Sequence, residues 1–380
     1  MKNSRTRILF LIDTLSRGGT ENQLILLSEN LSRSHFEPTI ATLYKTNHQD
    51  TFNINTPILN FNLSGPPFFR NMSLIWRLKR YLDKEKVDIL QSHFAESEIY
   101  GTMAARLSQY RPTLIATRRD LYHWINDEPW MFRISRRTVH WSDLVLVNSY
   151  RTLELCKKME RIPEGKIKVI QNGIVANKFN NTPTVEAKKI IGLEGEYPVV
   201  GVVGNWQPIK GLTYFLEAAV LVSKKIPKAR FVLAGFGPQE NELRSLVQDL
   251  GIYQRVLFLR SPTDIPMVMA AFDIAVQPSL SESFTNVLLE YMAAAKPIVA
   301  TKVGDAEKVI EDGKDGLLIE PENPHQLTVA ILSLYNNRAR AEEMGRLARE
   351  KVVANWSHEK MVEKYQLLYH ELVNRKRDKN

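Results

Sequence analysis

The sequence predicts an α/β protein built from two doubly wound parallel sheets in two domains. Short runs of apolar, β-branched residues alternate with helical stretches along the chain. Most of these runs are almost entirely apolar, as strands buried on both faces should be. A polar segment containing a proline interrupts the alternation near residues 178–196. We therefore expect one domain over residues 1–180 and a second over residues 181–360.

Twelve apolar runs are predicted as strands, six in each half of the chain. The strands of the first half are expected at residues 7–13, 39–44, 57–61, 88–92, 113–117 and 144–148. Those of the second half are expected at residues 198–204, 230–234, 256–258, 274–277, 297–300 and 316–319. Between them lie helical stretches, including residues 20–31, 74–84, 96–108 and 212–226. Strand–helix alternation favours parallel sheets with right-handed crossovers.

Charge is distributed unevenly between the two predicted domains. Residues 1–180 carry 26 Lys and Arg against 17 Asp and Glu, whereas residues 181–380 carry 25 of each. The whole net charge of +9 therefore belongs to the first domain. A basic face attracts nucleic acid, anionic lipid or an acidic substrate, and a solvated basic surface is the simpler alternative. No nucleic-acid recognition motif accompanies the charge, so we expect no nucleic acid partner.

Cysteine content and hydropathy exclude several classes of protein. The single cysteine, Cys156, rules out a disulfide framework and a cysteine-based zinc cluster. No apolar stretch approaches the roughly 18 residues that a membrane span requires. The chain also lacks Asp-x-Asp and His-Glu-x-x-His, two common metal-binding patterns. We expect a cytoplasmic protein.

Two loops that join a strand to a helix contain candidate binding residues. In the first, Gly18 and Gly19 follow the first predicted strand, where free N–H groups at a helix start can bind an anion. A tight turn without a ligand fits this loop equally well. Thr20 and Gln23 have the spacing of a capping box. In the second loop, Lys210 stands at a helix entrance, where it could meet a phosphate or simply be a surface lysine.

The strongest motif lies between residues 278 and 290, again between a strand and an apolar helix. Glu282 falls in the loop and could hold sugar hydroxyls. Glu290 lies about two turns into the helix among apolar residues, where a carboxylate can accept from a ribose diol. The alternative is a capped helix with two solvated glutamates. Unpaired N–H groups for a diphosphate would come from the first turn, which consists of Ser283, Phe284, Thr285 and Asn286.

His93 directly follows the strand predicted at residues 88–92. Ligands of doubly wound sheets bind at the carboxyl ends of the strands, so we expect this imidazole to point into a ligand cleft. A structural or surface histidine is the more common alternative.

Taken together, these residues resemble glycosyltransferase family 4, a family of retaining enzymes. Glu282 and Glu290 resemble its Glu-x7-Glu motif, with seven residues between the two acids. The loop at Gly18 and Gly19 resembles the family's N-terminal glycine loop, and Lys210 resembles its phosphate-binding lysine. The resemblance implies the GT-B fold, in which two Rossmann-like domains face each other across a cleft. It also suggests that a C-terminal helix at about residues 360–380 packs back on the first domain.

The resemblance implies transfer of a sugar from a nucleotide-diphosphate sugar to a glycan or lipid-linked glycan, in cell-surface polysaccharide synthesis. Lys210 would neutralise the donor diphosphate, Glu290 would bind the ribose, and Glu282 would contact the transferred sugar. His93 would lie beside that sugar. The resemblance also implies that the enzyme needs neither a metal nor another cofactor, which fits the missing Asp-x-Asp. The other residues expected at the donor are Gly18, Gly19, Asn205, Arg260, Ser283, Phe284, Thr285 and Asn286.

Some positions depart from the family pattern. Asn205 stands where the family usually has arginine, and Arg260 replaces a glycine near the expected base pocket. These departures keep open a non-catalytic nucleotide- or glycan-binding relative, and an epimerase of the same fold is a further alternative. Acceptor binding is expected on the basic first domain, with Arg118 and Arg119 as candidate contacts. Aromatic and basic residues mix in segments 66–80 and 118–137, which suits a peripheral position on an anionic inner membrane face.

Overall fold

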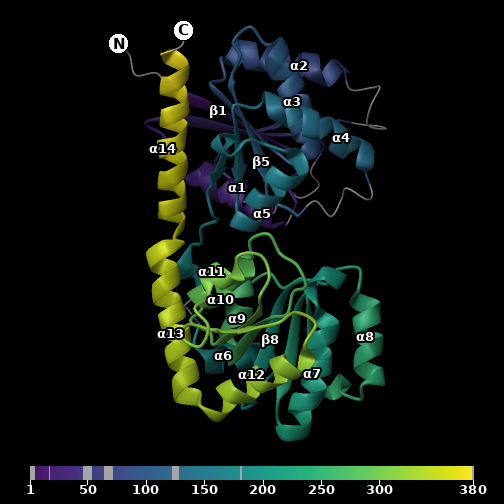
Figure 1. Ribbon diagram of the computed structural model, residues 1–380. Coiled ribbons are helices and arrows are strands. Elements are labelled where there is room, and N and C mark those ends of the chain that lie inside the picture. Colours follow the sequence, from purple (N-terminus) through teal and green to yellow (C-terminus); the bar gives the residue numbers. More distant parts are fainter. Residues whose placement is uncertain are drawn as a thin grey trace. The chain divides into compact units, whose positions relative to one another are not determined.

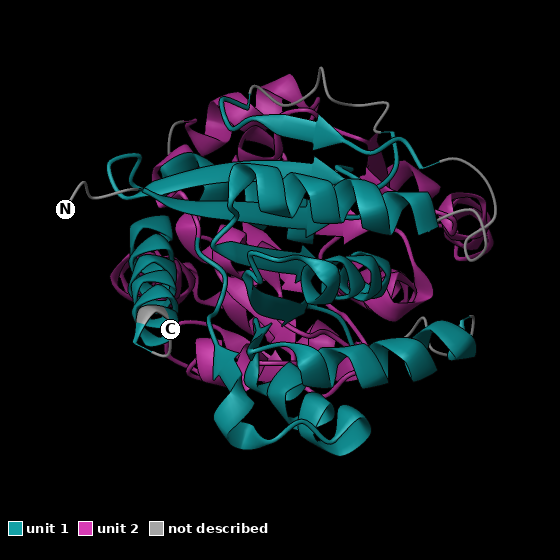
Figure 2. Cartoon of the chain, turned by 90° about the horizontal axis from the view of Figure 1, so that it is seen from above, with its two compact units in different colours: residues 1–173, 358–380 teal, residues 174–357 magenta. Residues whose placement is uncertain are grey.

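The computed structural model describes residues 5–16, 18–45, 54–63, 72–121, 128–179 and 182–378. The chain divides into two compact units, coloured separately in Figure 2. Unit 1 comprises residues 1–173 and 358–380, and unit 2 comprises residues 174–357. The boundary expected between residues 180 and 181 falls on positions outside the described ranges. Residues 64–71 and 122–127, which contribute to the aromatic and basic segments, also lie outside them.

Unit 1 contains a seven-stranded parallel sheet in the order β3-β2-β1-β4-β5-β6-β7. Helices follow most of its strands (Figure 1). The strands are β1 (Thr6–Ile12), β2 (Phe36–Thr42), β3 (Ile58–Asn60), β4 (Ile89–His93), β5 (Thr113–Arg118), β6 (Leu144–Val147) and β7 (Ile167–Val169). The helices are α1 (Gly19–Asn30), α2 (Met72–Glu85), α3 (Ala95–Leu107), α4 (Pro129–Thr138), α5 (Tyr150–Leu155) and α14 (His358–Arg377).

Unit 2 contains a six-stranded parallel sheet in the order β10-β9-β8-β11-β12-β13. Its strands are β8 (Val199–Asn205), β9 (Arg230–Phe236), β10 (Val256–Arg260), β11 (Ile274–Gln277), β12 (Ile298–Thr301) and β13 (Leu317–Ile319). Its helices are α6 (Thr184–Ile190), α7 (Leu212–Lys225), α8 (Glu240–Asp249), α9 (Ile265–Ala270), α10 (Asn286–Ala293), α11 (Ala306–Val309), α12 (Pro324–Asn336) and α13 (Arg338–Asn355).

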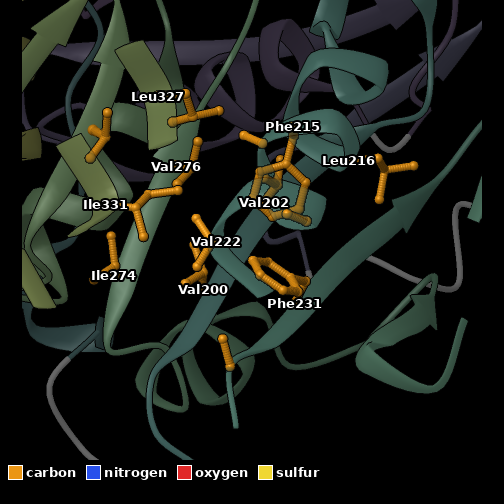
Figure 3. Close-up of a cluster of buried hydrophobic side chains, with 14 of the residues drawn as sticks. Val200, Val202, Phe215, Leu216, Val222, Phe231, Ile274, Val276, Leu327 and Ile331 are labelled. Carbon is orange, nitrogen blue, oxygen red and sulfur yellow. The ribbon is translucent and has the colours of Figure 1, made fainter. Parts of the chain in front are cut away.

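The apolar strands of unit 2 supply both faces of its sheet. Because side chains alternate along a strand, Val200 and Val202 enter one core cluster while Val199 enters the other. Figure 3 shows the first cluster, in which Phe215 of α7 and Ile331 of α12 cover the sheet. The two-sided burial explains why these strands are almost uninterrupted apolar runs.

The C-terminal helix α14 belongs to unit 1. Its apolar residues, spaced three and four positions apart, join the cluster formed by β1, β2 and α1. Tyr365 and Tyr369 are 2% and 0% exposed in this cluster. Unit 1 is thus built from two separate segments of the sequence.

Both sheets have the same doubly wound strand order, with the first strand of each unit in a central position. The chain moves outward from β1 to β2 and β3, and then returns to the opposite side of β1 as β4. Unit 2 repeats this around β8, with β9 and β10 on one side and β11 on the other. Ligands in such sheets bind at the carboxyl ends of the strands near this reversal. The loops that contain Gly18, Lys210 and Glu282 start there, and His93 ends β4 at the same edge.

Each of the twelve predicted strands overlaps an observed one, and the α/β fold class is confirmed. The strand β7 was not predicted, because it has only three residues and Lys168 interrupts its apolar character. No helix within the described ranges is long and apolar enough to cross a bilayer.

Candidate active site

Lys210 and Glu282 form an ion pair at the carboxyl edge of the unit 2 sheet. The Lys210 Nζ lies 2.6 Å from the Glu282 Oε1. The Ser279 hydroxyl donates to the same carboxylate oxygen at 2.8 Å. The lysine and glutamate side chains are 28% and 12% exposed, so a ligand can reach both groups. Such a pair can exchange partners when a ligand brings an anion for the lysine and hydroxyl groups for the carboxylate.

Two glycines allow the loops of this pair to approach each other. Gly211 follows Lys210 with a φ of +63°, and a Cβ there would lie 2.1 Å from the Pro278 carbonyl oxygen. Gly304 has a φ of +60°, and its Cβ would lie 2.6 Å from the Glu282 carbonyl oxygen. Any larger residue at either position would push the backbones apart. The loops after β8, β11 and β12 therefore fix where Lys210 and Glu282 stand.

Helix α10 begins immediately after the Glu282 loop. Its N-cap residue, Thr285, makes no side-chain capping bond. The Thr285 Oγ1 is buried without a hydrogen-bond partner among the described residues. Phe284 is 5% exposed and packs in the core with Leu288, which anchors the loop. Ser283 and Asn286 flank these two residues, so the first turn presents main-chain N–H groups, as an anion site requires.

Glu290 lies in the second turn of α10, four positions after Asn286 and on the same side of the helix. Burial raises the pKa of its carboxyl to about 7. Among the described residues, none forms a hydrogen bond or an ion pair with the Glu290 carboxylate. Hydroxyl groups that donate to this carboxylate would stabilise its charged form and lower that pKa.

Asn205 and Arg260 end the strands β8 and β10, which lie on either side of β9 in the unit 2 sheet. Asn205 is exposed, and it pairs in register with Phe236 of β9. The Arg260 side chain is 71% exposed, and its Nε lies 3.0 Å from the Glu240 carboxylate. Both therefore stand at the same sheet edge as Lys210, but Arg260 has an acidic partner of its own.

In unit 1, the glycine loop is occupied by a carboxylate of the same chain. Gly18 is the N-cap of α1, and a Cβ there would lie 2.2 Å from the Glu21 Oε2. The Ser16 hydroxyl donates to the Glu21 Oε1 at 2.6 Å. Glu21 thus folds back over the helix start at Gly18 and Gly19, where an anion was expected.

The predicted capping box is wrong. The helix begins at Gly19 rather than after Thr20, so Thr20 cannot be its N-cap. The Gln23 Nε2 instead donates to the Gly173 carbonyl at 2.9 Å, and its Oε1 accepts from the Gly173 N–H at 3.2 Å. Gln23 therefore ties α1 to the segment that follows β7.

His93 is the last residue of β4, and its ring is fully buried in unit 1. The Thr117 hydroxyl donates to the Ser92 carbonyl at 2.6 Å, so the His93 Nδ1, 3.2 Å away, must donate to that hydroxyl. The Gln91 side-chain amide lies 3.4 Å from the His93 Nε2 and accepts from the Tyr369 hydroxyl at 2.7 Å. Burial, with a smaller contribution from the Arg119 charge, holds the histidine pKa well below its usual value. The imidazole is neutral and held inside the unit, and its contact with a sugar stays a prediction.

Comparison with known proteins gives matches over both units. The family model described as Glycosyltransferase Family 4 matches residues 17–178, and the model described as Glycosyl transferases group 1 matches residues 197–337. The chain belongs to glycosyltransferase family 4.

Curated relatives match most of the chain. One is the Escherichia coli UDP-Gal:alpha-D-GlcNAc-diphosphoundecaprenol alpha-1,3-galactosyltransferase, 29% identical over 329 residues, which are 81% of this chain and 83% of that protein. Another is the Bacillus anthracis N-acetyl-alpha-D-glucosaminyl L-malate synthase, 25% identical over 83% of this chain and 82% of that protein.

Solved structures show the same fold. Anabaena HepE, crystallised in complex with UDP, has a TM-score of 0.86 over 96% of this chain and 100% of that chain, at 21% identity. A Thermosynechococcus elongatus sucrose-phosphate synthase has a TM-score of 0.81 over 97% and 99%, also at 21% identity. Both units of this family 4 member are therefore the Rossmann-like domains of a GT-B protein.

Arg118 of this family 4 member lies mostly inside unit 1, and its contact with an acceptor stays a prediction. Its Nη2 lies 2.7 Å from the Glu98 Oε2 and 2.9 Å from the Glu160 Oε1. All three side chains are at most 6% exposed. Two carboxylates inside the unit already engage this guanidinium.

Arg119 is positioned differently. Its guanidinium donates to the Asn172 Oδ1 at 2.8 Å and to the Tyr365 hydroxyl at 3.0 Å. It also borders a small pocket at the carboxyl edge of the unit 1 sheet, together with Thr20, Arg118 and Asp120. An acceptor contact of either arginine stays a prediction.

Asp13 is a further candidate site residue, which was not identified from the sequence. It follows β1 directly, and its Oδ1 accepts from the Ser97 N–H at 3.0 Å and from the Ser97 hydroxyl. Burial, aided by the nearby Glu96 charge, raises the pKa of the Asp13 carboxyl to about 7. A carboxyl at a strand end that titrates near neutrality can exchange protons with a ligand. Its position directly after an apolar strand was the signal available in the sequence.

Proposed function

We propose that this family 4 member is a retaining glycosyltransferase that moves a hexose from a UDP-sugar to a lipid-linked or glycan acceptor. The observation that carries the proposal is the contact of Lys210 with Glu282 beside the start of α10, eight positions before Glu290. A cation, a helix start and two carboxylates supply the groups that a diphosphate, a sugar and a ribose require.

The choice of uridine as the base rests on the relatives. The E. coli relative is named for transfer from UDP-Gal, and the HepE structures include complexes with UDP and with UDP-glucose. The E. coli relative also acts, by its name, on GlcNAc-diphosphoundecaprenol, a lipid-linked acceptor. We propose the same two classes of substrate here, in surface polysaccharide synthesis on the cytoplasmic side of the membrane.

Donor binding would rearrange the Lys210–Glu282 pair. The diphosphate attracts the lysine ammonium more strongly than a single carboxylate does, and the N–H groups at the start of α10 add to its stabilisation. Glu282, released from the lysine, can then accept from the hydroxyls of the transferred sugar. Glu290 accepts from the ribose diol, which favours its ionised form.

Without a covalent glycosyl-enzyme intermediate, transfer with retention needs attack on the face from which the nucleotide leaves. The bond from the sugar C1 to the donor phosphate oxygen breaks, and the acceptor oxygen forms the new bond to C1. The departing phosphate oxygen takes the acceptor proton, so UDP leaves as the only other product. The protein's part is to stabilise the charge that develops on the leaving diphosphate, and Lys210 and the start of α10 are placed for that. We propose no metal for this step.

Calorimetric titration of UDP, GDP and ADP into the full chain tests the proposal. We expect UDP to bind most tightly and Lys210→Ala to weaken it at least tenfold, because a charge-assisted contact to the diphosphate is lost. Lys225→Ala is the matched control, since Lys225 is an exposed lysine at the far end of α7. We also expect UDP release from a UDP-hexose to be the same with and without EDTA.

Two outcomes would contradict the proposal. Absence of binding by all three nucleotides would favour a non-catalytic relative. Conversion of the donor into another nucleotide sugar, with no glycosidic product when acceptor is present, would identify an epimerase.

A further inference from the structure

Helices α2 and α4 of unit 1 each carry an exposed stripe that starts with apolar residues and continues with arginine. On α2 the stripe consists of Met72, Trp76 and Arg80, spaced four residues apart on one face. On α4 it consists of Trp130, Arg133 and Arg137. Met72, Trp76 and Trp130 are 59%, 50% and 41% exposed. Large side chains with this exposure, gathered on two helices that both pack against α3, mark a surface that binds something.

An apolar pocket opens between the starts of these two stripes. Its volume is about 120 Å³, and α3 forms its floor between α2 and α4. The three helices lie on the same side of the unit 1 sheet (Figure 1). Among its described lining residues the pocket has one carboxylate, that of Glu96, which accepts from the Tyr44 hydroxyl at 2.6 Å. Its apolar lining comes from Met72, Ile75, Ile99, Met103, Trp130 and Met131, together with the Tyr100 ring.

The arginines of the stripes are available to an external anion. Arg80, Arg133 and Arg137 are exposed and have no ion-pair or hydrogen-bond partner among the described residues. The neighbouring Asp83 is already paired with Lys79 at 2.7 Å. The exposed Glu128 precedes α4 and adds one negative charge. The three arginines outweigh it, so the charge of the two stripes stays positive.

We propose that this α2–α4 face docks unit 1 on an anionic phospholipid bilayer. The tryptophans lie at the level of the headgroups, the three arginines contact lipid phosphates, and the pocket receives one acyl chain. Charge complementarity favours an anionic bilayer as the partner of this face. Unpaired arginines beside exposed tryptophans suit an interface that has anionic headgroups on one side and apolar acyl chains on the other. A second copy of the chain would place these same arginines against one another.

The proposal rests on the proposed transfer to a lipid-linked acceptor, since a bilayer holds such an acceptor. The helices α2, α3 and α4 follow β3, β4 and β5, so their first turns lie near the carboxyl edge of the sheet. The pocket and the tryptophans are at those first turns. A bilayer at this face would therefore bring the acceptor to the edge where Arg119 and Asp13 stand.

Co-sedimentation of the full chain with vesicles tests the docking. We expect binding to vesicles that contain phosphatidylglycerol, much weaker binding to phosphatidylcholine alone, and a fall in binding as salt is raised. Removing three surface arginines in Arg80→Ser/Arg133→Ser/Arg137→Ser should weaken binding roughly 100-fold, because each cation near an anionic surface contributes roughly fivefold. Trp76→Ser/Trp130→Ser should weaken it at least tenfold.

Matched controls separate docking from general charge and hydrophobicity. Trp141→Ser removes another exposed tryptophan of unit 1, 49% exposed, and should bind vesicles like the wild type. Three exposed lysines near the end of α7 serve as the charge control, in the variant Lys224→Ser/Lys225→Ser/Lys228→Ser. All variants should keep the wild-type affinity for UDP. This second measurement also separates the two proposals, because docking can fail while UDP still binds.

Phosphatidylglycerol with brominated acyl chains tests the pocket. Bromine quenches tryptophan fluorescence at short range, so we expect quenching in the wild type that is reduced in Trp130→Phe and unchanged in Trp141→Phe. Three results would overturn the proposal: no preference for phosphatidylglycerol, stripe variants that bind like the controls, or a wild-type dimer that Trp76→Ser/Trp130→Ser converts to a monomer.

Discussion

The two units use the same sheet order for opposite purposes at their carboxyl edges. In unit 2, Lys210 and Glu282 pair in a partly exposed position, and glycines hold their loops in place. In unit 1, Arg118 pairs with Glu98 and Glu160 in the interior, where solvent does not reach. The chemistry of the pairs is alike, and burial decides their roles. A pair that ligands can reach can change partners, whereas a buried set with every charge engaged holds elements together.

Removal of the buried cation should give the largest effect on stability. Arg118→Met leaves two buried carboxylates without a cation, and we expect the free energy of unfolding of unit 1 to fall by about 3–5 kcal/mol. Urea denaturation followed by circular dichroism measures this.

The chain provides a matched control for that change. Arg346 of α13 also pairs with two glutamates, Glu343 and Glu350, but its side chain is 54% exposed. Arg346→Met should leave the unfolding curve unchanged, because exposed pairs are screened by water. Equal losses in the two variants would show that burial is not what distinguishes the two sites.

Changes to the partly exposed pair of Lys210 and Glu282 should alter activity rather than stability. We expect Glu282→Gln to lower the transfer rate roughly 10²–10³-fold, as loss of a group that stabilises the transition state does. Its UDP affinity should stay the same or rise, because Lys210 loses the carboxylate that pairs with it in the free protein. Lys210→Ala should lose both transfer and UDP affinity. If Glu282→Gln weakened UDP binding as much as Lys210→Ala, the proposed exchange of partners would be wrong.

The smallest expected effect is a pH dependence at Glu290. Its pKa is about 7 in the folded protein, against an ordinary value of 4.5. The unfolded chain therefore ionises first, and the folded state loses stability as pH rises from about 4.5 to about 7. Glu290→Gln removes this cost, so the variant should be more stable than the wild type at about pH 8, by up to roughly 3 kcal/mol. The difference should vanish at about pH 4.

The contribution of Glu290 to UDP affinity should increase with pH, whereas its effect on folding stability becomes more unfavourable. The ionised carboxylate accepts better from a ribose diol, so the advantage of the wild type over Glu290→Gln in UDP affinity should grow as pH rises through 7. Calorimetry at three pH values checks this. An affinity ratio that does not vary with pH would place the ribose elsewhere.

The strands could be predicted because burial on both faces leaves an uninterrupted apolar run in the sequence. The run Val199–Val203 of β8 and the run Leu144–Val147 of β6 are clear examples. Strand β7 could not be predicted from its sequence. It lies at the edge of the sheet, and its Lys168 forms an ion pair with Glu371 of α14, which is distant in the sequence. A run of three residues with a lysine in the middle looks the same as a loop.

The site was predictable only in part. Lys210 and Glu282 each follow a predicted strand, but they are 72 positions apart. Only the resemblance to the family suggested that they belong to one site. Arg118 gives the opposite lesson. Its partners lie 20 and 42 positions away, so nothing in the basic run around it indicates that the guanidinium is buried. The raised pKa of Asp13 likewise depends on packing against α3, which no local pattern records.

The return of α14 to unit 1 has a consequence for how the chain is made. Unit 2 is one uninterrupted segment, residues 174–357, and all of it has been synthesised before α14 emerges. Unit 1 lacks Tyr365, Tyr369 and the rest of that core face until α14 has been synthesised. Although unit 1 is begun first, unit 2 is the first to be complete, and the ribosome carries an open apolar surface on unit 1 throughout. A chain cut short after α13 would leave that surface open permanently.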